Sequence, residues 1–213
     1  MKSIKYTLLS TVCFLGVVLF AACSNDDDTP QAPTPSETGT FLDTRDNTTY
    51  HWVRYGNLEW TTENLRFVPE SGIVQPTLPG PREYDDGVAK KYITTFGQLY
   101  NFEAAEAAVP DGWRLPTQAD WDDLDKQSNG DIKDAINLSL SGYYLVDEFF
   151  QQLHDVSYFT YIYGFYWTAD NDPSKSGDNF AFYRKITYNQ AGSTTESMNK
   201  SNYLSVRLVR DAQ

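Results

Sequence analysis

The sequence predicts an α+β domain in which two helices pack on short antiparallel β-sheets. Aromatic residues make up 15% of the chain, with 15 Tyr, 12 Phe and 5 Trp, which favours a β-rich, aromatic-packed body over a helical bundle. Short strand-like segments lie toward both ends of residues 39–213, and segments with helical spacing lie between them. This length is sufficient for one domain with a single core.

The beginning of this domain predicts a β-hairpin. Strand-like residues 40–43 and 49–53 flank a polar turn around Asp46, and Gly56 with Asn57 marks the next turn. A third strand then starts at Leu58 and ends near Asn64. We therefore expect the first three strands to be consecutive along the chain.

The first helix is expected within residues 96–108. Residues 67–91 are rich in Pro, Gly and charge and lack periodicity, which indicates a long surface excursion. Leu99, Phe102 and Ala105 then recur at helical spacing, and Pro110 to Gly112 ends the pattern.

Thr117 is the predicted start of a second helix. Its side chain can accept a hydrogen bond from the amide three residues on, and Asp120 complements the positive end of the helix. Trp121 and Leu124 give this helix an apolar stripe, and residues 132–136 predict a further helical turn or two.

The C-terminal part of the chain predicts strands separated by polar turns. The turns contain Asn, Asp, Gly and Pro, which favour reversal of the chain. The expected strands are residues 138–144, 149–153, 157–163, 166–169, 179–188 and 203–209.

The N-terminus predicts a lipoprotein signal peptide over residues 1–22. Lys2 and Lys5 precede an apolar run from Leu8 to Phe20, which is too short to be a stable spanning helix. Two alanines and Cys23 follow, and this arrangement resembles a bacterial lipobox, except that Phe20 stands where Leu is usual. The resemblance implies that Cys23 carries the lipid.

Residues 23–38 predict a flexible tether. They contain no large apolar residue, so they cannot bury enough surface to offset the entropy of ordering. The acidic run Asp26–Asp28 resembles the surface-export signal of Bacteroidetes lipoproteins. Together these features predict a lipid-anchored protein of the outer membrane that faces outward.

Charge and cysteine content exclude several function classes. The net charge is −12, and loss of Lys2 and Lys5 with the signal peptide makes it more negative by two, which argues against a nucleic-acid partner. Cys13 lies in the signal peptide and Cys23 carries the lipid, so residues 39–213 contain no thiol. Disulfides, cysteine–zinc sites and cysteine nucleophiles are therefore excluded in this domain.

Five segments, in order, resemble the FISUMP domain, the Fibrobacter major paralogous domain: Asp43–Tyr50, Gly56–Leu65, Phe96–Phe102, Pro110–Thr117 and Ser205–Asp211. The resemblance implies a fold of the C-type-lectin-like superfamily. Gly112–Thr117 also resembles the formylglycine-generating enzymes, whose active site needs cysteines that this domain lacks. Val109 and Leu208 stand where family members often carry cysteines, so we expect these two residues to pack together.

The candidate ligand-binding residues lie in the C-terminal half, where lectin-like folds present their ligands. Tyr and Asn supply rigid contact area and adaptable hydrogen bonds, and ordinary exposed strand composition is the alternative interpretation. Trp167 fits either the core or the floor of a site. The candidates are Trp167, Asp170, Asn171, Tyr183, Tyr188, Asn189, Asn202 and Tyr203.

A calcium site at the acidic turn Asp170–Asp172 is a weaker hypothesis. Carboxylate and amide oxygens suit Ca²⁺, but Asn and Asp also favour turns, and the sugar-binding motifs of calcium-dependent lectins are absent. We therefore expect no metal and no cofactor.

The sequence as a whole predicts a non-catalytic, membrane-anchored binding or adhesion module for an extracellular glycan or protein. A structural subunit of a surface or fimbrial assembly is the alternative, and an extracellular glycan-active enzyme is a third interpretation. No catalytic motif singles out an active site.

Overall fold

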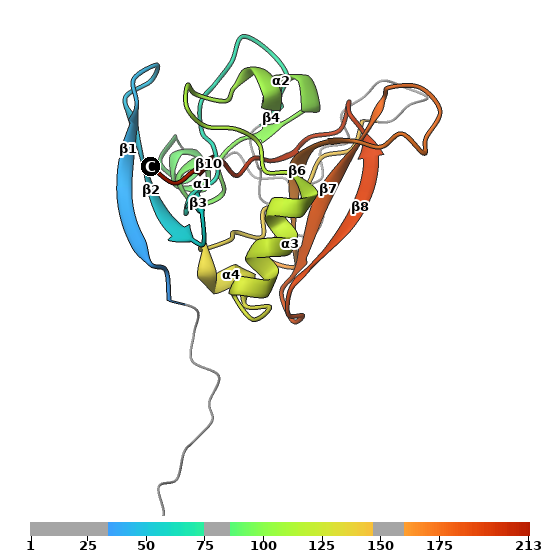
Figure 1. Ribbon diagram of the computed structural model, residues 1–213. Helices are drawn as coiled ribbons and strands as arrows, with labels where there is room; N and C mark the ends of the chain where they lie inside the picture. The colour runs from blue at the N-terminus through green and yellow to red at the C-terminus, as the bar shows by residue number, and fades with distance from the viewer. Residues whose placement is uncertain (1–33, 75–85, 147–159) are drawn as a thin grey trace, which may run out of the picture. The chain divides into compact units, whose positions relative to one another are not determined.

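A computed structural model describes residues 34–74, 86–146 and 160–213 (Figure 1). These residues all belong to one compact unit, Ala32–Gln213. The predicted signal peptide, Cys23, most of the tether and the expected strand 149–153 lie outside the described residues, as does the first part of the expected strand 157–163.

The first sheet contains the predicted hairpin and the end of the chain. Its order is β1 (Glu37–Asp43), β2 (Thr48–Tyr55), β3 (Leu58–Thr61) and β10 (Val209–Asp211), and all neighbours are antiparallel. Glu37 and Thr38, which were assigned to the tether, already pair with Arg54 and Val53. Pairing with β2 supplies the backbone hydrogen bonds that composition alone did not reveal.

The second sheet has six strands in the order β4 (Ile73–Val74), β5 (Leu99–Tyr100), β9 (Leu204–Ser205), β6 (Tyr163–Asn171), β7 (Phe180–Thr187) and β8 (Ser193–Asn199). Only the β6–β9 contact is parallel. The sequence did not predict β8, because its residues are mostly Ser, Thr and Asn and only partly buried.

Four helices lie within the described residues: α1 (Asp86–Phe96), α2 (Phe102–Ala107), α3 (Gln118–Gln127) and α4 (Ile132–Ala135). The domain is therefore a mixed α+β fold with two sheets rich in antiparallel pairs, as the sequence predicts at this level.

The prediction of a helix within residues 96–108 is wrong before Phe102, where α2 begins. Helix α1 ends at Phe96, whose carbonyl accepts a hydrogen bond from Asn64 Nδ2 (2.8 Å), and Gly97 then adopts a φ of +74°. The chain continues as β5 before α2 begins at Phe102. The surface excursion predicted through residue 91 is likewise wrong from Asp86 onward, where α1 starts.

Helix α3 confirms the predicted start at Thr117. Thr117 and Asp120 form a reciprocal capping box, and Asp120 also accepts a hydrogen bond from Arg114. Trp121 and Leu124 are buried as the stripe predicted. Asp120 therefore fixes both the helix start and the strand-like segment before it.

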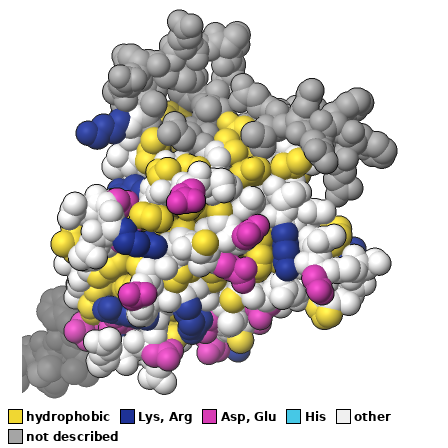
Figure 2. All heavy atoms as spheres, turned by 90° about the horizontal axis from the view of Figure 1, so that it is seen from above, with side chains coloured by type: hydrophobic (Ala, Val, Ile, Leu, Met, Phe, Trp, Pro, Cys, Tyr) yellow, Lys and Arg dark blue, Asp and Glu magenta, His cyan; other side chains and the backbone are white. Residues whose placement is uncertain are grey.

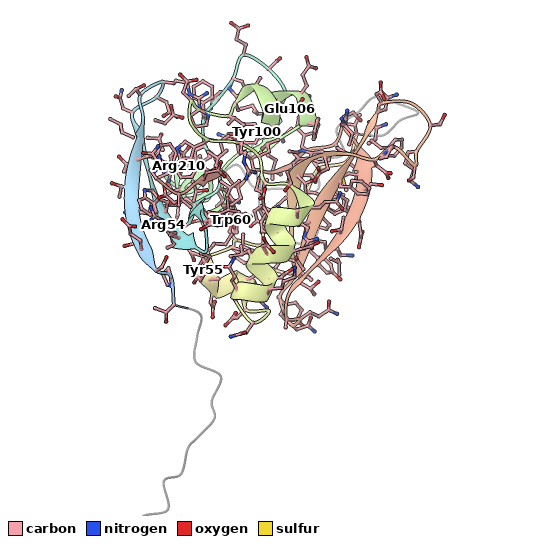
Figure 3. The ribbon with its side chains drawn as sticks, in the orientation of Figure 1. Arg54, Tyr55, Trp60, Tyr100, Glu106 and Arg210 are labelled. Atoms are coloured by element: carbon pink, nitrogen blue, oxygen red, sulfur yellow. The ribbon has the colours of Figure 1, made fainter. Side chains whose placement is uncertain are left out.

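Helix α3 lies between the two sheets, as Figure 1 shows. The ring of Trp121 lies 4.9 Å from Trp60 of β3 and 5.7 Å from Tyr166 of β6. In Figure 3 Trp60 lies between the first sheet and α3, while Arg54 and Arg210 lie beside that sheet. Both arginines donate to Glu59, whose carboxylate is buried.

Val109 and Leu208 belong to the same part of the core. Leu208 is buried in the cluster that contains Trp113 and Trp167, and Val109 packs against that cluster while partly buried. Direct packing of Val109 on Leu208 stays a prediction.

Candidate functional site

Three of the predicted ligand-binding residues are part of the core. Trp167 is fully buried, and its Nε1 donates to the carbonyl of Tyr100 (2.8 Å). Tyr183 is 4% exposed and donates to Glu196 Oε2 (2.7 Å); burial and this carboxylate raise the pKa of Tyr183. Asn202 is 7% exposed and bonds to the backbone of Val146. The structure thus assigns these side chains to packing and internal hydrogen bonding rather than to surface contacts.

Asp170 and Asn171 lie at the C-terminal end of β6, next to the start of α3. Asp170 Oδ2 accepts a hydrogen bond from the backbone amide of Gln118 (2.6 Å), and Asn171 is exposed. Asp172 accepts from the amide and hydroxyl of Ser174. Within the described residues, no group of three or more His, Cys, Asp or Glu is placed to hold a metal ion.

Tyr188 and Asn189 lie beyond the other end of the same strand pair. Tyr163 pairs with Thr187, whereas Asn171 pairs with Ala181. At about 3.3 Å per residue, the two ends of β6 are roughly 25 Å apart. Tyr203, which forms an isolated bridge with Tyr144, is partly buried. The predicted residues therefore do not form one site.

The end at Tyr188 contains a surface hollow of about 290 Å³, here called the turn hollow. It lies where the β7–β8 turn meets the loop between α3 and α4. Seven residues line it: Asn129, Gly130, Asp131, Lys133, Asn189, Gln190 and Ala191. Only Asn189 among them was predicted as a ligand contact, and Tyr188 adjoins it in the chain.

Lys133 holds the turn in place. Its Nζ donates to the backbone carbonyls of Thr187 (3.2 Å), Tyr188 (2.7 Å) and Gln190 (3.1 Å). These three bonds use the three donors of the ammonium group. Lys133 therefore acts as a positioning residue for the turn rather than as a free cation for a ligand.

Backbone contacts fix the opposite wall. The amide of Gly192 donates to the carbonyl of Gly130 (2.6 Å), and the amide of Gly130 donates to the carbonyl of Asp125 (2.9 Å). Asn129 and Gly130 both have positive φ, at +52° and +80°. The loop after α3 thus makes the tight reversal that brings it against the β7–β8 turn.

Arg184 connects the same two regions underneath the hollow. Its side chain is 5% exposed and donates to Asp122 (2.6 Å) and Asp125 (3.2 Å) of α3, and to Ser193 (3.0 Å) of β8. Ser193 Oγ in turn donates to Asp125 (2.5 Å). The position of the β7–β8 hairpin on α3 is therefore set by an ionic network centred on the buried Arg184.

The turn hollow is suited to a ligand with many hydroxyl groups. Asn129, Asn189 and Gln190 offer amide donors and acceptors, and Asp131 offers a carboxylate. Tyr188, with 58% of its surface exposed, supplies an aromatic ring at the same turn. Polar side chains in a hollow, with an exposed ring at the same turn, offer partners for both the hydroxyl groups and the apolar face of a sugar.

A second hollow of about 310 Å³ lies beside α2. Its walls include Glu70, Gly72, Asn101 and Glu103, but the side chain of Asn101 already accepts from the amide of Ala104 as the helix cap. No residue of this hollow was predicted from the sequence. Neither hollow has an aromatic residue among its lining residues, but the exposed Tyr188 directly precedes Asn189 of the turn hollow in the chain, so the turn hollow is the better candidate site.

One face of the domain mixes charges of both signs. On the face shown in Figure 2, acidic and basic side chains are interspersed with hydrophobic ones rather than gathered into one field. No helix of the described residues is long and apolar enough to cross a membrane.

The fold and the hollow together define a mixed α+β domain with a polar surface site. Residues 53–144 match the family model described as the Fibrobacter succinogenes major domain. The match confirms the resemblance drawn from the sequence motifs and includes three of the five motif segments in full. No curated protein and no solved structure matches the chain.

Proposed function

We propose that this chain is a lipid-anchored, cell-surface module that binds an extracellular glycan at the turn hollow and performs no catalysis. The carrying observation is the exposed Tyr188 next in the chain to a hollow lined by amides and one carboxylate, on a turn whose backbone Lys133 holds. Asp131 is the sole acid among the residues that line the hollow, whereas glycoside hydrolysis uses a pair of carboxylates.

The proposed location rests on the N-terminal sequence. Cys23 after a short apolar run would carry the lipid, and the acidic run that follows would direct the protein to the outer face of the outer membrane. We also assign the domain to the C-type-lectin-like superfamily, on the motif segments and on the two antiparallel-rich sheets. Strand β1 begins at Glu37, so the tether that we propose would end before that residue.

A shallow polar hollow implies weak binding to a single glycan end. A millimolar dissociation constant corresponds to about −4 kcal/mol and a micromolar one to about −8 kcal/mol. Many copies anchored in one membrane would engage a repetitive glycan together, so the apparent affinity would rise without any new contact. Weak individual sites are therefore compatible with adhesion.

A glycan array tests the proposal. The chain from residue 24 onward, which keeps every described residue, is applied with and without Ca²⁺. We expect specific hits that Asn189→Ala and Gln190→Ala abolish, because both side chains line the hollow. Asn171→Ala is the matched control, since it changes an exposed Asn at the far end of β6.

Two results would contradict this assignment. An array without any hit argues against a glycan ligand, and loss of binding in Asn171→Ala but not in Asn189→Ala argues for the opposite end of β6.

A role as a subunit of a surface assembly is the second candidate. Strand β8 favours this role, because it is an edge strand of the six-stranded sheet and contains no Pro, Lys or Arg that would hinder pairing with another strand. An end strand offers its outer backbone groups to another strand. Light scattering after size exclusion tests this role, because a strictly monomeric chain at high concentration would oppose self-assembly through β8.

A further inference from the structure

The backbone of Tyr161 is unusual for its residue type. Its φ is +69°, and the other non-glycine residues with positive φ in the described part of the chain are Asn47, Asn129 and Asn137. Asn tolerates this conformation, whereas for a bulky side chain it is a strained outlier that costs about 1–2 kcal/mol. Since Asn or Gly would serve the turn better, the retained Tyr indicates a use for the ring itself.

The ring of Tyr161 is held in place and yet 61% of the residue is exposed. Its hydroxyl lies 3.2 Å from the hydroxyl of Tyr92, and its ring meets that of Phe96 edge-on at 5.5 Å. Its amide donates to the carbonyl of Leu140 (2.7 Å). Helix α1 and the backbone therefore orient an aromatic surface toward solvent.

The backbone of Tyr161 lies near that of the β7–β8 turn. The amide of Tyr188 donates to the carbonyl of Ile162 (3.0 Å), which continues the β6–β7 pairing by one residue pair. In an antiparallel pair, facing residues are about 5 Å apart, so the backbone at Tyr161 is within about 10 Å of that at Asn189. Tyr161, Ile162 and Tyr188 are three of the six exposed large hydrophobic residues among those described.

We propose that the ligand of the turn hollow is an oligosaccharide, with one sugar unit at the hollow and Tyr188 and a further unit stacked on Tyr161. This inference rests on the proposed glycan-binding function and adds the length of the ligand. Tyr161, held by α1, and the exposed Tyr188, paired with Ile162, give two aromatic rings to a chain of sugars, and the amides of Asn189 and Gln190 bind the hydroxyls of the first unit. Rigid aromatic contacts lose little side-chain entropy on binding.

The test compares ligand lengths by calorimetry with the full chain in detergent. The probes are glucose, mannose and N-acetylglucosamine, and a linear disaccharide and tetrasaccharide of each. We expect at least tenfold tighter binding of the tetrasaccharide than of the monosaccharide for the preferred sugar. Tyr161→Asn should remove this length advantage and leave monosaccharide binding unchanged, because it removes the ring and keeps a residue suited to positive φ.

Two controls separate the ring from the fold. Tyr161→Phe keeps the ring and loses the hydroxyl contact with Tyr92, so it should retain the length advantage. Tyr188→Ala should weaken monosaccharide and tetrasaccharide alike.

The outcomes distinguish the two proposals. A length advantage that survives in Tyr161→Asn, or equal binding of monosaccharide and tetrasaccharide by the unmodified chain, overturns the oligosaccharide inference and leaves the glycan-binding function standing. Absence of binding for every probe overturns both.

Discussion

Lys133→Met should loosen the β7–β8 turn and destabilise the domain by about 2 kcal/mol. The substitution removes three hydrogen bonds, of 2.7, 3.1 and 3.2 Å, from the carbonyls of the turn. A bond from a charged donor contributes about 1.5–3 kcal/mol when buried, but these bonds are partly exposed, and the freed carbonyls regain water. For a domain of this size, about 2 kcal/mol corresponds to a Tm lower by roughly 4–8 °C.

The assay is urea unfolding, combined with hydrogen exchange of the amides in the turn and with glycan affinity. Lys126→Met is the control, because Lys126 Nζ reaches only Asp123 (3.4 Å) and both side chains are largely exposed. Such a surface pair contributes about 0–1 kcal/mol. If Lys133→Met and Lys126→Met have equal stability and the exchange of the turn is unchanged, Lys133 does not position the hollow.

Three further predictions follow from the packing, the charges and the N-terminus. Gly97→Ala should cost at least about 2 kcal/mol in urea unfolding and more than Gly112→Ala: both have positive φ, but only at Gly97 would a Cβ meet backbone, at 2.7 Å. Burial raises the pKa of Glu59, but its hydrogen bonds to two arginines more than offset this and hold the pKa below 4.5. The stabilisation by Glu59 is therefore present above pH 4.5 and is lost as the pH falls through the lowered pKa. Glu59→Gln should flatten the curve of unfolding free energy against pH in that range, and an unchanged slope would contradict this. Cys23→Ala should move the protein from the membrane fraction to the soluble fraction, and retention in the membrane would refute the lipid anchor.

Local signals in the sequence were sufficient where a side chain acts on its own segment. Thr117 and Asp120 cap α3 through contacts three residues apart, and the spacing of Trp121 and Leu124 shows which face is buried. The first hairpin is equally local, since its turn and both strands are consecutive. These elements were predicted correctly because neighbouring residues decide them.

Elements that depend on distant partners were missed. Strand β5 has helical spacing around Leu99, yet it pairs with β4 and β9 and follows a glycine whose position allows no side chain. Strand β8 lacks a hydrophobic pattern and forms through its long ladder with β7. In both cases tertiary pairing outweighs the local preference of the residues.

The turn hollow also depends on residues that are distant in sequence, so it could not be predicted from local patterns. Its two walls are about sixty residues apart in sequence and meet through the Gly192–Gly130 hydrogen bond and through Lys133. Composition made Tyr188 and Asn189 candidate ligand contacts, whereas Asn129 and Asp131 resemble an ordinary loop after a helix. The positive φ expected of Asn followed by Gly was the available signal for a tight reversal there.

The family match includes the residues of one wall of this hollow but not those of the other. Residues 53–144 include Asn129, Asp131 and Lys133, whereas Asn189, Gln190 and both exposed tyrosines lie beyond residue 144. Lys133 donates its three hydrogen bonds to carbonyls of the β7–β8 turn, so the matched segment contains the residue that holds this turn in place. The contacts that would select a glycan, by amide hydrogen bonds and by stacking, come largely from outside it. The family match therefore includes the residues that support the hollow, whereas most of the contacts in the proposed glycan site lie beyond residue 144.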